Sequence, residues 1–188
     1  MEQQDQWDCI LSSEFKIYNL QTYNDHRGFF LENYSKKISD DLCLSFKQDN
    51  LSYSKKNVIR GLHYQWDKPM GKMVTVINGS IKDYIVDIRK DSPNFGKVYS
   101  FVLTDKNRKA LWVPAGYAHG FEALEDSYVF YKCTEFYNKE KESGINFFDK
   151  NLNIRSTIGL KNAIMSDKDS QAMSLQTYLK DPKFFMEK

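Results

Sequence analysis

The 188-residue sequence predicts an all-β domain, built as a sandwich or a barrel. Three observations support this prediction. Short runs rich in Val, Ile, Tyr and Phe recur at near-regular spacing, with turn residues between them. The chain has 13 Phe, 12 Tyr and 3 Trp, and aromatic residues favour strands. Few stretches have a helical pattern, and the length suits one domain over residues 1–188.

The expected elements are short and follow one another along the chain. Residues 1–12 read as a loose arm or a short edge strand, and residues 24–28 as a turn. Short helices are expected at 35–42 and within 167–180. Residues 115–121 are expected to form a glycine-flanked bend that carries a histidine. Strands are expected at 15–20, 29–34, 46–54, 57–65, 97–103, 110–114 and 128–137.

The clearest local signal is the dipeptide Asn78-Gly79, which lies between two alternating apolar runs. Such a pattern predicts a two-residue hairpin, which would pair Val74 with Asp83. Lys72 would then lie diagonal to Asp83 and Asp87 on a face that is otherwise apolar. Two interpretations stay open, a structural ion pair at a barrel rim or a site lysine whose charge is set by its neighbours.

The strand at 57–65 reads N-V-I-R-G-L-H-Y-Q and contains two polar side chains that are unusual in a core. In a regular strand Arg60 and His63 would point to opposite faces. Gly61 lies between them, and a strand glycine often marks a bulge, which would turn both toward one cavity. The alternative is an edge strand, with Arg60 in water and His63 a satisfied core histidine.

Composition argues against several classes of protein. The chain has 27 basic and 25 acidic residues, a net charge of +2, and no basic run, so binding to nucleic acid is not expected. The N-terminus is polar and acidic, unlike a signal peptide, and no apolar run approaches the ~18 residues of a membrane helix. Three cysteines without C-x-x-C spacing fit a reducing compartment, so a cytoplasmic location is expected.

Five motifs occur in a fixed order, and together they carry a family resemblance. They read R-G-L-H-Y-Q, G-K-M-V-T-V-I-N-G-S-I-K-D-Y-I-V-D-I-R, S-P-N-F-G, L-W-V-P-A-G-Y-A-H-G-F and Y-K-C-T-E-F-Y. From about residue 27 to residue 169 the chain resembles the dTDP-4-dehydrorhamnose 3,5-epimerase family, sugar epimerases of the cupin superfamily. The resemblance implies a double-stranded β-helix (jelly roll) with a core at about 15–150 and a C-terminal segment, 151–188, near the site.

The resemblance also implies how the protein works. It implies a homodimer that exchanges N-terminal strands, a nucleotide-linked 4-keto-6-deoxy-hexose as substrate, and neither a metal nor a redox cofactor. Epimerisation beside a ketone needs a base, an acid on the opposite face and a cation at the enolate oxygen. The family pattern assigns these roles to His63, Tyr131 and Lys72. Asp169 in S-D-K-D would orient His63.

Further residues match the family's substrate-binding positions. Asp83 is expected to tune Lys72, and Arg60 and His119 to lie near the pyrophosphate or the sugar. The complete set implied for substrate binding is Arg27, Phe30, Glu32, Gln48, Asn50, Arg60, Asp83 and His119.

Several alternatives remain open at this level. The same residues could serve a single-site 3- or 5-epimerase on a related sugar, and Tyr131 favours epimerisation over ketoisomerisation. A cupin that only binds a sugar nucleotide would need no acid–base pair. His63, His119 and Asp83 could in principle hold zinc or iron, as in a metal-dependent dioxygenase.

Overall fold

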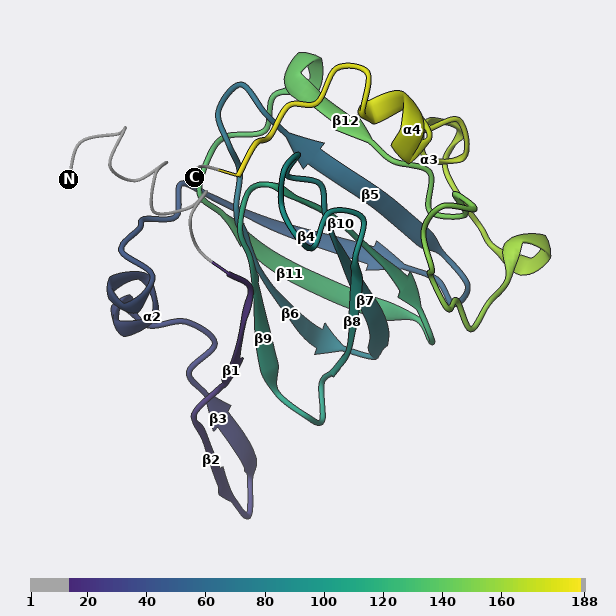
Figure 1. Cartoon of the computed structure of the whole chain (residues 1–188). Helices are drawn as coiled ribbons and strands as arrows, with labels where there is room; N and C mark the ends of the chain where they lie inside the picture. The colour runs from purple at the N-terminus through teal and green to yellow at the C-terminus, as the bar shows by residue number, and fades with distance from the viewer. Residues whose placement is uncertain (1–13, 187–188) are drawn as a thin grey trace.

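Two antiparallel five-stranded sheets face each other in the computed structural model, which describes residues 14–186 (Figure 1). The expected arm at residues 1–12 lies outside this range. In spatial order, the first sheet contains β1 (Lys16–Asn19), β9 (Lys109–Val113), β6 (Lys72–Asn78), β11 (Ser127–Cys133) and β4 (Gln48–Ser54). The second contains β12 (Glu142–Gly144), β5 (Ile59–Gln65), β10 (Tyr117–Ala123), β7 (Ser80–Asp87) and β8 (Val98–Thr104). The all-β prediction is confirmed.

A separate two-stranded hairpin projects from the sheets at the lower left of Figure 1. It is formed by β2 (Thr22–Asp25) and β3 (Gly28–Leu31), and the expected turn lies between them. Helix α2 (Lys36–Asp41) follows and confirms the predicted helix at 35–42. The hairpin carries exposed aromatic rings, with Phe30 66% exposed.

The predicted hairpin at Asn78-Gly79 is wrong. β6 pairs with β9 and β11, whereas β7 pairs with β8 and β10, so the two strands lie in different sheets. Val74 is therefore opposite Leu111 and Tyr131, not Asp83. The dipeptide makes a corner, where Gly79 has φ +91° and a Cβ would lie 2.4 Å from the backbone oxygen of Asp126. Alternation of apolar and polar residues indicates only that one face of a strand is buried. A strand that crosses to the facing sheet also buries one face, so the same pattern fits it equally well.

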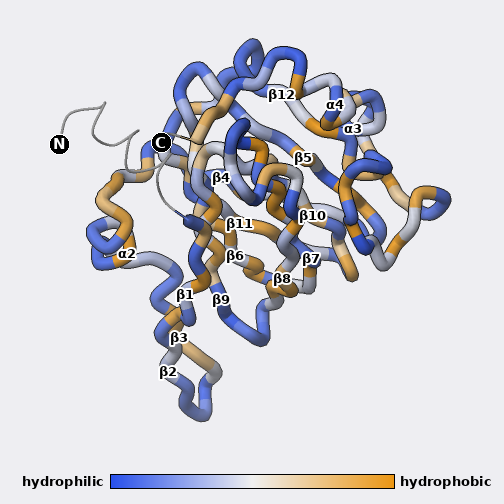
Figure 2. The backbone as a smooth tube through the Cα atoms, in the orientation of Figure 1, coloured by the Kyte–Doolittle hydropathy of each residue, from blue (hydrophilic) through white to orange (hydrophobic). Residues whose placement is uncertain are grey.

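Two hydrophobic clusters hold the sheets in place. The first lies between them, where Val74 and Val76 pack with Ile81 and Ile85 from β7. The second joins Leu62 and Tyr84 to a group of C-terminal residues, namely Phe147, Leu175, Tyr178 and Phe184. Burial of each such side chain contributes about 1.5–3 kcal/mol. The C-terminal segment is thus anchored on the second sheet, as Figure 2 shows by its apolar stretches near β5 and β12.

Helices are few and short in this part of the chain. The helix expected within 167–180 is two single turns, α3 (Asp167–Ser170) and α4 (Leu175–Tyr178), with Ser166 and Ser174 as N-caps. Two 3-10 turns, η1 (Lys139–Lys141) and η2 (Leu160–Asn162), are the other helical pieces after α2 within residues 14–186. Within residues 14–186 no helix has the length and apolar character to cross a membrane.

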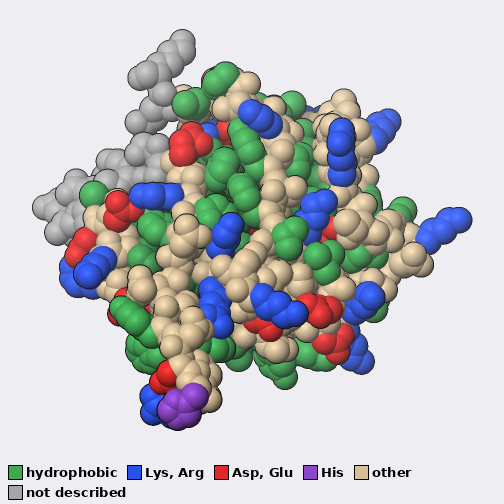
Figure 3. Space-filling view, turned by 90° about the horizontal axis from the view of Figure 1, so that it is seen from below, with side chains coloured by type: hydrophobic (Ala, Val, Ile, Leu, Met, Phe, Trp, Pro, Cys, Tyr) green, Lys and Arg blue, Asp and Glu red, His purple; other side chains and the backbone are tan. Residues whose placement is uncertain are grey.

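The expected bend at 115–121 is also wrong, because most of it belongs to the central strand β10. Every residue of this strand is buried between β5 and β7. Figure 3 shows basic and acidic side chains interspersed on the face it presents, in keeping with the net charge of +2.

Candidate active site

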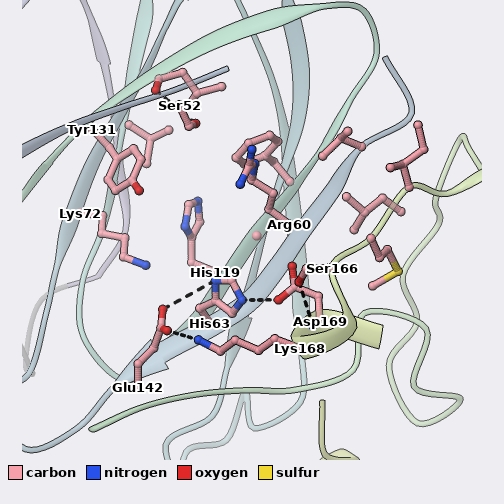
Figure 4. A pocket seen from close by; sticks show the side chains of 18 of the residues that line it. Ser52, Arg60, His63, Lys72, His119, Tyr131, Glu142, Ser166, Lys168 and Asp169 are labelled. Atoms are coloured by element: carbon pink, nitrogen blue, oxygen red, sulfur yellow. Dashed lines mark hydrogen bonds and ion pairs between the residues drawn. The ribbon is translucent and has the colours of Figure 1, made fainter. Parts of the chain in front are cut away.

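A cavity of about 490 Å³ opens between the sheets, at the end where β5 meets the C-terminal segment. Both sheets supply polar side chains to it, and α3 closes one side (Figure 4). Six residues singled out from the sequence line this cavity: Arg60, His63, Lys72, His119, Tyr131 and Asp169.

A bulge in β5 brings Arg60 and His63 to the same cavity, as the glycine between them predicted. His119 is opposite His63 and Phe121 is opposite Arg60, so β5 has one extra residue over this interval. Gly61 has φ +99°, and a Cβ there would lie 2.5 Å from the backbone oxygen of His119. Glycine is required here both by the left-handed backbone and by the close approach of β10.

His63 is paired with Asp169. Nε2 of His63 lies 2.5 Å from Oδ1 of Asp169, which is 5% exposed. Asp169 stands in the first turn of α3, where its backbone N–H donates to Oγ of Ser166 at 3.1 Å. Burial opposes ionisation of Asp169, but the hydrogen bond and charge of His63, with donors from Ser166 and Gly61, outweigh it and lower the pKa of the carboxyl. Asp169 is therefore a carboxylate at neutral pH.

Lys72 and Tyr131 lie across the cavity from the His63–Asp169 pair, and both side chains point into it (Figure 4). They come from the neighbouring strands β6 and β11. Burial raises the pKa of the Tyr131 phenol. Tyr131 is thus a neutral hydroxyl that can donate a proton, and the side chain of Lys72 lies on the same side of the cavity (Figure 4).

Asp83 contacts His119 directly. Nε2 of His119 is 3.0 and 2.9 Å from the two carboxylate oxygens of the fully buried Asp83. Burial raises the pKa of Asp83, while the charges of His119 and then Lys72 act in the opposite direction. Asp83 is thus hydrogen-bonded to the ring of His119 and holds it in place, and the charge of Lys72 acts on Asp83 more weakly than that of His119.

The remaining predicted substrate residues fall into two groups. Gln48 and Asn50 line an adjoining pocket of about 270 Å³, which shares His63, Lys72 and Tyr131 with the main cavity. Arg27, Phe30 and Glu32 belong to the projecting hairpin or its C-terminal end, and none of them lines the cavity of its own chain. Arg27 instead pairs with Asp25 at 2.7 Å.

Sequence reasoning missed two charged residues of the site, Glu142 and Lys168. Oε1 of Glu142 is 3.8 Å from Nδ1 of His63, and Oε2 forms an ion pair with Lys168. Burial opposes ionisation of Glu142, but Lys168, His63 and Lys72 outweigh it and lower the pKa of the carboxyl. Glu142 lies in the charged run K-E-K-E-S-G, which is typical of a solvated loop. The signal that could have found it is its place two residues before Gly144 in a short extended piece.

The histidines do not form a metal site. His63 faces Asp169 and Glu142, whereas His119 faces Asp83. Over residues 14–186 no group of three or more His, Cys, Asp or Glu side chains is arranged to hold a metal ion.

Comparison with known proteins gives a consistent result. The family model for dTDP-4-dehydrorhamnose 3,5-epimerase matches residues 12–177. The dTDP-4-dehydrorhamnose 3,5-epimerase of Shigella flexneri is 42% identical over 158 residues, which cover 81% of this chain and 86% of that protein.

Solved structures agree with the sequence comparison. The dTDP-6-deoxy-D-glucose-3,5-epimerase of Legionella pneumophila Philadelphia 1, in complex with dTDP-4-keto-L-rhamnose, superposes with a TM-score of 0.88. It is 37% identical, and the match covers 93% of this chain and 94% of that one. The dTDP-4-dehydrorhamnose 3,5-epimerase of Bacillus anthracis, with TDP and PPi bound, gives a TM-score of 0.81 at 40% identity, covering 86% and 94%.

The fold and the comparisons define an isomerase of the cupin type, a jelly roll with titratable side chains around an internal cavity. This confirms the predicted fold class and enzyme class. The chain belongs to the dTDP-4-dehydrorhamnose 3,5-epimerase family, as its five motifs predicted.

Proposed function

We propose that this chain epimerises C3 and C5 of dTDP-4-keto-6-deoxyglucose, as a dTDP-4-dehydrorhamnose 3,5-epimerase in dTDP-rhamnose biosynthesis. One observation carries the proposal. The His63–Asp169 pair lies on one side of a cavity, and Tyr131 and Lys72 lie on the other (Figure 4). A base and an acid on opposite sides of a sugar ring are what inversion at carbon requires.

Each inversion begins with removal of a proton from the carbon next to the C4 ketone. Asp169 holds Nε2 of His63, so Nδ1 carries the free lone pair and accepts this proton. The electron pair of the C–H bond moves onto the ketone oxygen and forms an enolate. The negative charge of Asp169 stabilises the imidazolium that results.

The enolate is then protonated from the opposite face. Lys72, a partly buried residue of the cavity wall, supplies a positive charge to the enolate oxygen, where the negative charge develops. Tyr131 donates its hydroxyl proton to the carbon. The chain's own side chains thus supply the base, the acid and the cation, and the reaction has no net oxidation or reduction.

The nucleotide part of the substrate is assigned to the mouth of the cavity. Arg60 is exposed there, fixed by hydrogen bonds from Nε to Oγ of Ser54 at 2.9 Å and from a guanidinium NH₂ to the backbone oxygen of Tyr53 at 3.0 Å. A guanidinium so placed suits the pyrophosphate. The Legionella relative, whose structure contains dTDP-4-keto-L-rhamnose, supports a thymidine diphosphate sugar as the ligand.

A homodimer would explain the position of the projecting hairpin. Arg27, Phe30 and Glu32 lie away from their own cavity, so we assign them to the nucleotide in the cavity of the partner subunit. Sedimentation of the purified protein tests this, and a monomer in the active protein would exclude it.

The expected cytoplasmic location is part of the same proposal, because nucleotide sugars are intracellular metabolites.

Solvent exchange tests the proposed reaction. The protein is incubated with dTDP-4-keto-6-deoxyglucose in D₂O, and the C3 and C5 protons are followed by NMR. Deuterium at both carbons, lost in His63→Ala, is the expected result. Deuterium at one carbon would replace the proposal with a single-site epimerase. No exchange at either carbon would leave a different sugar, or binding without catalysis, as the better account.

A further inference from the structure

The proposed reaction leaves the enzyme in the wrong protonation state after each inversion. One proton has moved from the carbon to His63, and another has moved from Tyr131 to the carbon. The site then holds an imidazolium and a phenolate. Before a second carbon can react, His63 must lose a proton and Tyr131 must regain one. A two-carbon epimerase therefore needs a route by which the base is reset.

Glu142 occupies the position that such a route requires. Its Oε1 lies 3.8 Å from Nδ1 of His63, the nitrogen that Asp169 leaves free. A small movement of the carboxylate would bring this contact into hydrogen-bond range. On the other side of the ring, Nε2 leads to Asp169, which is 5% exposed. The side toward Glu142 is therefore the one that leads to solvent.

The second carboxylate oxygen of Glu142, Oε2, lies on the side of the residue toward solvent. Its Oε2 is paired with Lys168, whose side chain is 50% exposed, and it accepts a hydrogen bond of 3.1 Å from the hydroxyl of Tyr137, which is 51% exposed. Glu142 itself is only 12% exposed at its side chain. It thus connects the base with the surface, and Figure 4 shows a contact from its carboxylate to His63 and another to Lys168.

We infer that Glu142 is a proton relay that resets His63 between inversions. This inference rests on the proposed function. The proton on Nδ1 of His63 passes to Oε1 of Glu142, and from the carboxyl group to water at the edge marked by Tyr137 and Lys168. Water returns one proton to the phenolate of Tyr131. Over each cycle one proton from the substrate leaves to solvent and one proton from solvent enters the sugar.

The charges around Glu142 favour a carboxylate that passes a proton on over one that keeps it. Lys168, His63 and Lys72 outweigh the effect of burial and lower its pKa, so the group is ionised and ready to accept. An acid with a lowered pKa also releases the proton to water readily.

Replacement of Glu142 by glutamine tests the relay, because the side chain keeps its size and cannot carry the proton. Turnover and deuterium wash-in are measured at low and at rising concentrations of imidazole buffer. We expect the turnover of Glu142→Gln to fall about tenfold or more at low buffer and to recover as imidazole takes over the transfer. Deuterium should enter the second carbon later than the first, and this delay should be longer in Glu142→Gln than in the wild type.

The matched control is Asp49→Asn, which removes a carboxylate paired with Lys132 at 2.7 Å outside the cavity. This variant and the wild type should show no dependence on buffer concentration. A loss in Glu142→Gln that imidazole does not recover, or no loss at all, would overturn the relay. If the glutamine variant does not fold, Glu142→Ala takes its place, because alanine cannot carry a proton either, and turnover that imidazole does not restore would overturn the relay in the same way. Absence of wash-in in the wild type would instead sink the proposed function.

Discussion

Nε2 of His63 lies 2.5 Å from Oδ1 of Asp169, although 106 positions separate the two residues in the chain. The strand β5 carries the histidine, and a single helical turn packed against that strand carries the aspartate. This contact decides which ring nitrogen is free to act as a base. It also decides which side of the ring faces Glu142, and so where a proton can leave.

If Tyr131 is the acid, its replacement should affect hydrogen exchange with solvent and inversion of configuration at carbon to different extents. In Tyr131→Phe, His63 still removes the proton and can return a deuteron to the same face, while the opposite face has no donor. We expect inversion to fall by about 100-fold or more, with exchange in D₂O less affected. Tyr128→Phe, on the same strand but 43% exposed, is the control. Equal losses of exchange and inversion would argue against an acid role.

The charge of Lys72 predicts an effect on the chemical step. Lys72→Met removes the cation at the enolate oxygen and keeps most of the side-chain volume. We expect kcat to fall about 100- to 1000-fold, because the charge acts mainly on the developing enolate. Lys132→Met, whose lysine pairs with Asp49 at the edge strand, is the control. An increase in KM with kcat unchanged would assign Lys72 to substrate binding alone.

The lowered pKa of Asp169 predicts how stability changes with pH. The folded carboxyl binds its proton less readily than the unfolded one, so it stabilises the fold above the ordinary value of 3.8. This contribution is lost as the pH falls through the lower, folded pKa. We expect Asp169→Asn to cost about 2 kcal/mol at neutral pH and to flatten the loss of stability below pH ~4. Urea unfolding at several pH values measures both, and an unchanged acid limb would contradict the pairing.

The backbone at Gly61 predicts a large difference between two similar substitutions. Gly61 and Gly159 both have positive φ, +99° and +70°, but a Cβ at Gly159 would meet nothing within 4 Å. We expect Gly159→Ala to cost about 1–3 kcal/mol from backbone strain alone. Gly61→Ala adds the clash with β10 and should cost about 3 kcal/mol or more. Urea midpoints compare the two, and equal costs would show that the bulge tolerates a side chain.

Much of the site could be predicted because its residues sit in short motifs with their own signals. The glycine between Arg60 and His63 predicted the bulge that turns both into one cavity, and the structure contains that bulge. Glu142 and Lys168 could not be found in the same way. Each stands in a charged stretch whose local pattern is that of a surface loop. Only the pairing of β12 with β5 brings Glu142 to His63, and only the packing of α3 against β5 brings Lys168 to Glu142.

The sequence by itself determined most of the strands, the family and six of the polar residues in the cavity, because alternation and motif spacing are local properties of the chain. The tertiary structure alone decided how the strands are paired. β6 and β7 have the pattern of a hairpin, yet they belong to facing sheets. The pattern requires only that one face of each strand is buried, and two facing sheets bury these faces as well as a hairpin within one sheet would. The same holds for the pairing of His63 with Asp169 and Glu142, where contacts between distant residues depend on the path of the chain and not on any local pattern.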